Sequence, residues 1–259
     1  MERLRAGVQA VRVRTDLIPR VALALDPELA QLGEAIEDTA AFGAQDLPAV
    51  LPPWCDLLLG RLEGAAVAAW TVPASDPGVR ARGLPVRLAY LLGADVLFAT
   101  GTAVALTDLA ALPAASPRSA SGPGPGPVDL TLVSDHLNLL GDNPLVGPNL
   151  EALGPRFPDL SEAYDGPLRT LAHEIAAARG VTLGEGVLAA VPAPNLATAE
   201  EYTVLRELGT ELAGCAAVPE VIVARHMGMH VLALLVVRGG AHARAHAVGI
   251  LRDLAARLD

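Results

Sequence analysis

Hydrophobic residues fall into short apolar runs, which alternate with longer segments whose apolar positions recur at helical spacing. Short apolar runs bounded by Gly, Pro or Asp are typical of buried strands. They predict strands at residues 20–25, 57–62, 65–71, 95–100, 128–135, 186–191, 211–214 and 231–237. The second and third of these strands are expected to form a hairpin around Glu63-Gly64.

The segments between the strands predict helices. These cover residues 1–19, 26–42, 84–93, 167–179, 199–208, 219–227 and 243–258. Asp26 is expected to cap the second helix, with Pro27 at its first position. Strands that alternate with helices indicate an α/β fold with a mostly parallel sheet covered on both faces. The length fits one domain over residues 1–259.

One segment departs from this pattern. Residues 113–127, PAASPRSASGPGPGP, consist mainly of Gly, Pro, Ser and Ala. Such a composition cannot pack a core, so we expect a flexible loop rather than a boundary between domains.

Composition excludes several classes of function. A net charge of −10 repels phosphate backbones, so no nucleic-acid partner is expected. All 19 basic residues are Arg, which excludes Schiff-base chemistry and a P-loop, since both need Lys. Cys55 and Cys215 form neither a disulfide framework nor a metal site. The apolar runs are too short to cross a bilayer, and we expect a cytoplasmic protein without a membrane partner.

The most polar, turn-rich stretch is DHLNLLGDNPLVGPN, residues 135–149. It lies within the first of four blocks, at residues 129–149, 155–165, 185–201 and 218–234. These blocks resemble the trimeric purine nucleoside phosphorylases, a group that includes the methylthioadenosine phosphorylases. The resemblance implies an α/β sandwich whose mixed sheet closes into a distorted barrel, and a homotrimer with active sites at its interfaces. It also implies that a purine nucleoside and phosphate, the co-substrate, give the free base and ribose 1-phosphate without a cofactor or a metal.

The phosphate ligands of that family are largely replaced. Where the family has a Gly-Ser-Gly loop, this chain has Asp26, Pro27 and Glu28, which remove an N–H group and add negative charge. The family's Arg and His are absent from the stretch that ends at Ser75. Arg80 and Arg82 could substitute for them, although two solvated surface arginines are the simpler interpretation.

Other positions keep part of the expected site. Thr100, Gly101 and Thr102 match a loop of the family that presents N–H groups to phosphate. Ala216 replaces a phosphate-binding Ser, and Cys215 stands where the family has a Met beneath the ribose. No base or His near Cys215 in sequence supports a reactive thiol.

The purine clamp is altered as well. Leu196 and Ala197 replace the stacking Phe and the base-binding Glu of the family, and Gly239 replaces an Asn that contacts the purine. A helix-start role explains Glu201. His242 keeps the position of a ribose-binding His, and Phe157 that of a Phe that reaches into the neighbouring subunit. A helix-start residue and an interface contact are the simpler readings of these two.

Framework residues of the family persist. They are Asp135, His136, Asn138, Tyr164, Glu220, Arg225 and His226. In the family such residues shape loops and support subunit contacts. Retention of the framework, with losses at the ligands, favours a family homologue with weak or absent phosphorolysis, acting as a pseudoenzyme, scaffold or ligand binder. The alternatives are an active purine nucleoside phosphorylase with unusual ligands, and a nucleoside hydrolase that uses Asp26 or Glu28.

Overall fold

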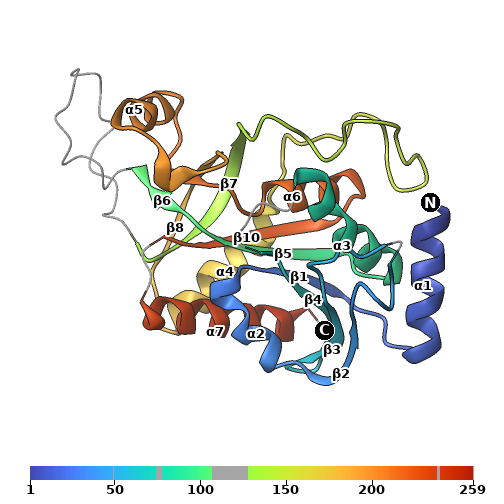
Figure 1. Cartoon of the computed structure of the whole chain (residues 1–259). Helices are drawn as coiled ribbons and strands as arrows, with labels where there is room; N and C mark the ends of the chain where they lie inside the picture. Colours follow the sequence, from blue (N-terminus) through green and yellow to red (C-terminus); the bar gives the residue numbers. More distant parts are fainter. Residues whose placement is uncertain (49, 74–77, 107–127, 238–239, 259) are drawn as a thin grey trace.

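A ten-stranded mixed sheet forms the centre of the computed structural model, which describes residues 1–48, 50–73, 78–106, 128–237 and 240–258 (Figure 1). The order across the sheet is β2-β3-β4-β1-β5-β10-β7-β8-β9-β6. The strands are β1 (Val21–Leu25), β2 (Glu37–Phe42), β3 (Leu57–Leu62), β4 (Ala65–Thr71), β5 (Val96–Thr102), β6 (Val104–Ala105), β7 (Leu130–Asn138), β8 (Leu183–Ala190), β9 (Leu212–Gly214) and β10 (His230–Val236).

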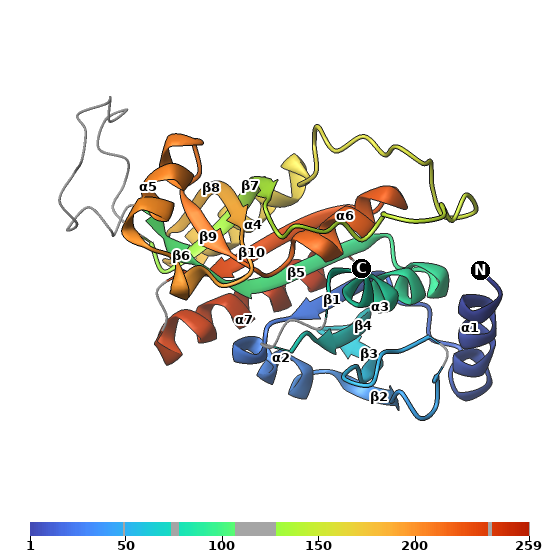
Figure 2. The ribbon, with the colours of Figure 1, turned by 45° about the horizontal axis from the view of Figure 1, so that its top comes forward.

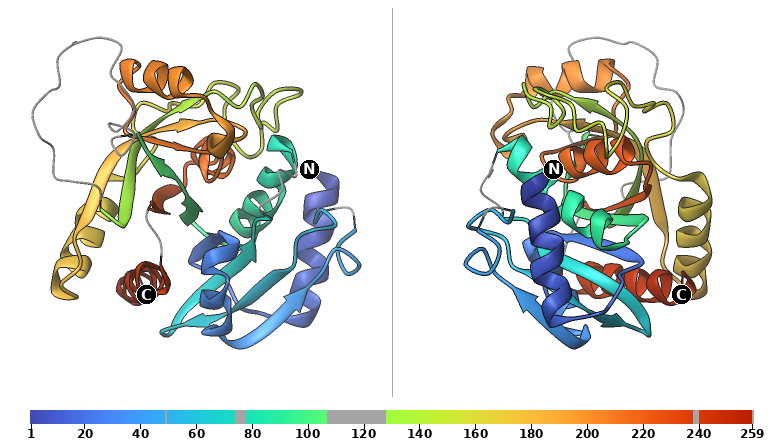
Figure 3. Two further views of the ribbon diagram at one scale, coloured as in Figure 1. Left: turned by 60° about the vertical axis from the view of Figure 1, so that its left-hand side comes forward. Right: turned by 90° about the vertical axis from the view of Figure 1, so that its right-hand side faces the viewer.

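Helices connect these strands and cover the sheet. They are α1 (Glu2–Arg14), η1 (Pro27–Leu29), α2 (Gln31–Glu34), α3 (Val79–Leu92), α4 (Gly166–Ala178), η3 (Pro194–Leu196), α5 (Ala199–Glu207), α6 (Val218–His226) and α7 (Ala241–Arg257). α3 packs against α6 on one face, and α4 packs against α7 on the other (Figure 3). α5 lies at the end of the sheet, beside β6 and β9 (Figure 2).

The sheet is mixed and closes on itself, as the resemblance implies. β1 runs parallel to β4 and β5, and β5 runs parallel to β10, whereas β10 and β7 are antiparallel. β6 follows β5 after one residue and pairs with β9, the strand beside β8. One continuous stretch of chain therefore pairs with β10 at its start and with β9 at its end, and this closes a distorted barrel.

Aliphatic side chains fill the core on both sides of the sheet. In β1, Ala22 and Ala24 join the cluster beneath α3 and α6, whereas Val21, Leu23 and Leu25 join the cluster beneath α4 and α7. Alternation along the strand places successive side chains on opposite faces. β1 is buried throughout, which explains why its sequence is an uninterrupted apolar run.

Most of the predicted elements are confirmed, and the hairpin has the predicted bounds. The helix predicted over 26–42 is wrong. Helical structure ends at Glu34, and the following residues form β2 at the edge of the sheet, paired with β3. Asp38 has a φ of +51°, which breaks any helix there. Two helix bounds also differ: α1 ends at Arg14, and α3 begins before Pro85, which lies inside it.

No helix in the described part of the chain is both long and apolar enough to cross a membrane. The segment 113–127, for which the sequence predicts a flexible loop, lies outside the described residues.

Candidate functional site

A cavity of about 660 Å³ lies where several parallel strands end. Its walls come from the loop after β1, the end of β5, η3, the loop after β9, and α3. The carboxyl ends of parallel strands are the usual place for a ligand site in α/β folds, because the loops there converge. The lining residues include Asp26, Pro27, Glu28, Arg82, Thr100, Thr102, Pro194, Leu196, Cys215 and Ala216.

Thr100 fixes the loop that carries Asp26. The main-chain N–H of Asp26 donates to Thr100 Oγ1 at 2.7 Å, and the same hydroxyl donates to the carbonyl of Ala24 at 3.2 Å. Asp26 Oδ1 in turn accepts from the N–H of Glu28 at 2.9 Å, which caps η1 as its sequence predicts. Thr100 thus acts as a buried joint between β1 and β5, with its hydroxyl already engaged.

Asp26 brings a partly buried carboxylate to the cavity. Burial raises the pKa of Asp26 above its usual value and outweighs the opposing hydrogen bond from the Glu28 N–H. The charge of Glu28 also raises the pKa, while Arg82 lowers it. Glu28 itself is paired with Arg244 of α7 at 3.1 Å. The electrostatic environment of this wall therefore disfavours additional negative charge.

Arg82 is buried, so the interpretation of it as a solvated surface residue is wrong. Its Nε and Nη2 donate to the two carboxylate oxygens of Glu220 at 2.7 and 2.9 Å, and its Nη1 donates to the carbonyl of Cys215 at 2.9 Å. Arg82 is 5% exposed and Glu220 is fully buried. Arg80, by contrast, is exposed, and its Nε lies 3.5 Å from a carboxylate oxygen of Asp142.

Several other lining residues are apolar. Leu196, on η3, is 83% exposed, and it lines the cavity together with Cys215 and Ala216. A side chain at Gly101 would overlap the methyl group of Ala216, which explains why glycine stands behind this wall. Glu201 does not line this cavity; its carboxylate accepts from the N–H of Thr198 at 2.6 Å in a capping box.

The structure brings together only some of the residues that the sequence nominates. Thr100, Leu196 and Cys215 line the cavity, and Gly101 lies directly behind it. His242 is on the exposed start of α7, where its Nε2 lies 2.8 Å from that of His246. Phe157 is 86% exposed on a loop.

The nominated positions Ser75 and Gly239 lie outside the described residues. Sequence reasoning nominated Thr102, which lines the cavity, but missed Pro194 as a lining residue and misread Arg82. No local signal marks Arg82, because its partner Glu220 is 138 positions away.

The stretch 135–149 serves as framework. His136 Nδ1 lies 3.0 Å from the hydroxyl of the buried Tyr164, and burial lowers the pKa of His136. Asn138 and Asn143 each accept from a main-chain N–H two residues ahead, as in Asx turns. Asn149 Oδ1 is 3.1 Å from His226 Nε2. These contacts hold the long loop in place away from the cavity.

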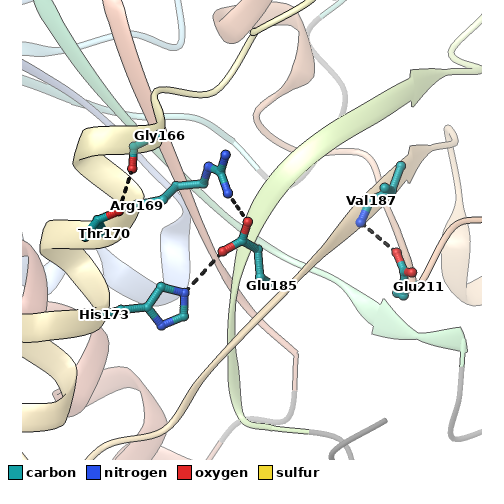
Figure 4. A network of polar contacts seen from close by, with 7 residues as sticks. All are labelled: Gly166, Arg169, Thr170, His173, Glu185, Val187 and Glu211. Atoms are coloured by element: carbon teal, nitrogen blue, oxygen red, sulfur yellow. Dashed lines mark hydrogen bonds and ion pairs between the residues drawn. The ribbon is translucent and has the colours of Figure 1, made fainter. Parts of the chain in front are cut away.

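A second polar cluster joins α4 to β8. Figure 4 shows Glu185 between Arg169 and His173, which extend toward it from α4. One carboxylate oxygen of Glu185 pairs with Arg169, and the other lies 3.2 Å from His173 Nε2. Nearby, Glu211 accepts from the N–H of Val187 at 2.7 Å. The carboxylates are thus engaged within the chain, and the cluster ties a helix to the sheet.

Metal ligands do not gather in the described residues, where no group of three or more His, Cys, Asp or Glu side chains could hold an ion.

Known proteins are similar to this chain in sequence and in fold. The sequence profile of the Phosphorylase superfamily matches residues 26–250. Purine nucleoside phosphorylase 1 of Geobacillus stearothermophilus is 34% identical over 242 residues, which cover 89% of this chain and 82% of that protein. The chain belongs to the purine nucleoside phosphorylase family. The Bacillus subtilis protein of the same name is 32% identical, over 90% of this chain and 83% of its own length.

Solved structures of the family have the same fold. The purine nucleoside phosphorylase of Schistosoma mansoni, solved in complex with acetate, superposes with a TM-score of 0.85 at 25% identity. The alignment covers 100% of this chain and 97% of that one. A second structure of the same enzyme, solved with a monocyclic inhibitor, gives a TM-score of 0.84 at 26% identity, with coverage of 100% and 97%.

Proposed function

We propose that this family member uses its cavity to bind a purine or purine nucleoside and that it catalyses phosphorolysis weakly or not at all. The observation that carries the proposal is the carboxylate of Asp26 in the cavity wall, followed by Pro27. In the resembled family, a glycine- and serine-containing loop at this place presents N–H groups to phosphate. Pro27 has no N–H, and Asp26 repels an anion in a partly desolvated site.

Among the described residues, the two arginines nearest this carboxylate wall do not offset the repulsion. Arg82 lines the cavity, but its guanidinium binds both oxygens of Glu220 and the carbonyl of Cys215. Arg244 is engaged with Glu28. A phosphate ion would therefore meet the carboxylate of Asp26, and it would have to displace Glu220 from Arg82 or Glu28 from Arg244 to gain an arginine of its own.

The part of the cavity formed by Ala193 and Leu196 favours binding of a purine over catalysis of phosphorolysis. Leu196 and Ala193 offer apolar surface for a flat heterocycle. Phosphorolysis also requires stabilisation of the negative charge that builds on the leaving purine, and one missing donor of that kind costs roughly 10²–10³ in rate. Ala197 and Leu196 provide no such donor from a side chain.

Two other reactions remain as alternatives with support of their own. The names of the curated relatives favour an active purine nucleoside phosphorylase. The raised pKa of Asp26 favours hydrolysis. In that reaction Asp26 would take a proton from water as the water oxygen bonds to the sugar carbon, and the base would leave with the electrons of the broken bond.

Release of free base from inosine, guanosine and methylthioadenosine, with and without phosphate, distinguishes the three proposals. We expect base release near the uncatalysed rate in both conditions, together with measurable binding of hypoxanthine or inosine by calorimetry. Phosphate-dependent release at ordinary enzyme rates would contradict the proposal. Base release at the same enzymatic rate with and without phosphate would establish hydrolysis. The Asp26→Asn variant should then lose this activity.

The assembly and location follow from the resemblance. We infer a single domain, a homotrimer and a cytoplasmic location. The match of the superfamily profile over residues 26–250 supports one domain. The exposure of Phe157, 86%, supports an interface at its loop. Light scattering tests the assembly, and a monomer at micromolar concentration would contradict it.

A further inference from the structure

Helix α3 carries two buried arginines with different surroundings. Arg82 and Arg87 are 5% and 8% exposed. Both lie on the helix that packs against α6. Arg82 meets the carboxylate of Glu220, at the start of α6. Arg87 borders the same cavity as His226, at the end of α6. Where α3 and α6 meet, Arg82 is therefore paired with a carboxylate, whereas Arg87 lies near His226, which offers no negative charge.

The contacts of Arg87 do not satisfy it. Its Nη2 donates to the carbonyl of Pro144 over a long 3.4 Å. Its Nε is buried and has no hydrogen-bond partner among the described residues. No ion pair joins Arg87 to a carboxylate in the described part of the chain. Burial is the cause that lowers the pKa of Arg87.

An uncompensated guanidinium in such a place is costly. Arginine stays protonated in proteins, so it cannot escape the cost of burial by losing its proton. A buried ion without a partner of opposite charge therefore destabilises the folded state. Natural structures offset such a penalty with a counter-ion, and a guanidinium binds oxyanions best because its N–H groups match a pair of oxygens.

Space for a counter-ion exists beside Arg87. A cavity of about 490 Å³ opens there, lined by the bases Arg80, Arg87 and His226 and by Pro144, Val146 and Asn149. Among the described residues, no Asp or Glu lines it. Arg80 lies at the rim, with Asp142 as its exposed partner. Burial and the charge of Arg87 lower the pKa of His226, so the positive charge beside this cavity is that of the two arginines.

We propose that this cavity is a binding site for a small oxyanion, of the phosphate or carboxylate class, with Arg87 as its principal ligand. Arg80 adds charge at the rim, and His226 lies at the inner end. None of the residues that line this cavity lines the cavity at Asp26. The proposal therefore stands whether or not the protein catalyses phosphorolysis.

Two probes locate and measure the site. Crystals of the whole protein soaked in selenate should show an anomalous peak within hydrogen-bonding distance of the Arg87 guanidinium. In solution, inorganic phosphate should raise the Tm above that in sodium chloride of equal ionic strength. Each increase of about fivefold in the ratio of folded to unfolded protein should raise the Tm by roughly 2–4 °C. A selenate peak only beside Asp26, or none at all, would overturn the proposal.

Variants separate this site from other effects of phosphate. Arg87→Met, which keeps much of the side-chain volume, should lose at least most of the phosphate-induced shift. Any shift that remains reports the cavity at Asp26, because that cavity is untouched. Should Arg87→Met fail to fold, Val146→Glu provides the second test. Val146 is 53% exposed on the cavity wall, so a carboxylate there can reach the site from within the chain.

The Val146→Glu variant should be more heat-stable than the wild type in sodium chloride and insensitive to phosphate. Leu139→Glu is the matched control, since Leu139 is 43% exposed and does not line this cavity. It should keep the wild-type response. An unchanged response in Val146→Glu and Arg87→Met would contradict the proposal. Dissociation of an oligomer by Arg87→Met would instead assign the cavity to an acidic side chain of a second copy.

Discussion

Arg82 and Glu220 form a buried, two-point ion pair that joins α3 to α6, with donor–acceptor distances of 2.7 and 2.9 Å. The third contact of Arg82, to the carbonyl of Cys215 at 2.9 Å, extends the connection to the cavity wall. The pair therefore stabilises the position of the loop after β9. It also shows how a side chain that the sequence offers as a phosphate ligand is used within the fold.

Removing one partner of this pair should destabilise the protein strongly. Glu220→Leu leaves Arg82 buried without its carboxylate, and we expect a loss of about 3–5 kcal/mol in the free energy of unfolding. The double variant Arg82→Met/Glu220→Leu should recover a large part of that loss, because no unpaired charge remains. Urea unfolding measures both. Single losses that simply add in the double variant would contradict a coupled pair.

Asp26 should make stability depend on pH in an unusual direction for a carboxylate. Burial raises its pKa above the usual 3.8 in the folded state. Just above that pH, the folded chain keeps a proton that the unfolded chain has lost, so the stability falls as pH rises through this window. The side chain of Asp26→Asn can still accept the hydrogen bond from the Glu28 N–H. Because an amide does not titrate, the variant should not lose stability in this pH window.

The comparison is urea unfolding of the wild type and Asp26→Asn between about pH 3.5 and pH 7. The stability of the variant relative to the wild type should increase with pH and then level off. Asp16→Asn is the control, because Asp16 is exposed on the segment after α1. A difference that decreases with pH would mean that Asp26 is stabilised, rather than penalised, as an anion.

Gly101 should tolerate no side chain. A methyl group there would overlap that of Ala216 and would lie only 3.1 Å from Leu235 Cδ2. Gly101→Ala is expected to cost about 1–3 kcal/mol by overpacking and to weaken ligand binding by shifting the cavity wall. Gly166→Ala is the control, because open space surrounds Gly166 at the start of α4. Unfolding measurements should find it within about 0.5 kcal/mol of the wild type. Equal effects at the two glycines would contradict this account.

The sequence predicts the buried strands well and the edge of the sheet poorly. β1 and β10 are recognisable because almost every residue in them is apolar and buried. β2 is exposed along most of its length, and only Phe42 in it is buried. Its sequence, EDTAAF, follows a short helix, and the spacing of apolar residues does not change where the helix ends and the strand begins. Pairing with β3, rather than any local preference, decides its conformation.

The family resemblance predicts only part of the candidate site. It nominates Thr100, which lies in β5, and Leu196, on η3, and both line the cavity. No pattern of local residues reveals the burial of Arg82, because its carboxylate partner lies on a distant helix. His242 lies at the exposed start of α7, with its Nε2 2.8 Å from that of His246, and the ribose-binding role that the resemblance implies for it stays a prediction.

Rebuilding the loop after β1 should restore affinity for phosphate. The triple substitution Asp26→Gly, Pro27→Ser and Glu28→Gly removes the repelling carboxylates and supplies an N–H and a hydroxyl. We expect phosphate-dependent base release to increase at least about tenfold, which corresponds to roughly 1.4 kcal/mol in the barrier. The measurement is base release from inosine across a phosphate titration. Glu2→Gln/Asp16→Asn removes the same charge from exposed positions far from the cavity and should change nothing. If the rebuilt loop binds phosphate without faster release, the missing charge stabilisation around Leu196 and Ala197, rather than the phosphate loop, limits the reaction.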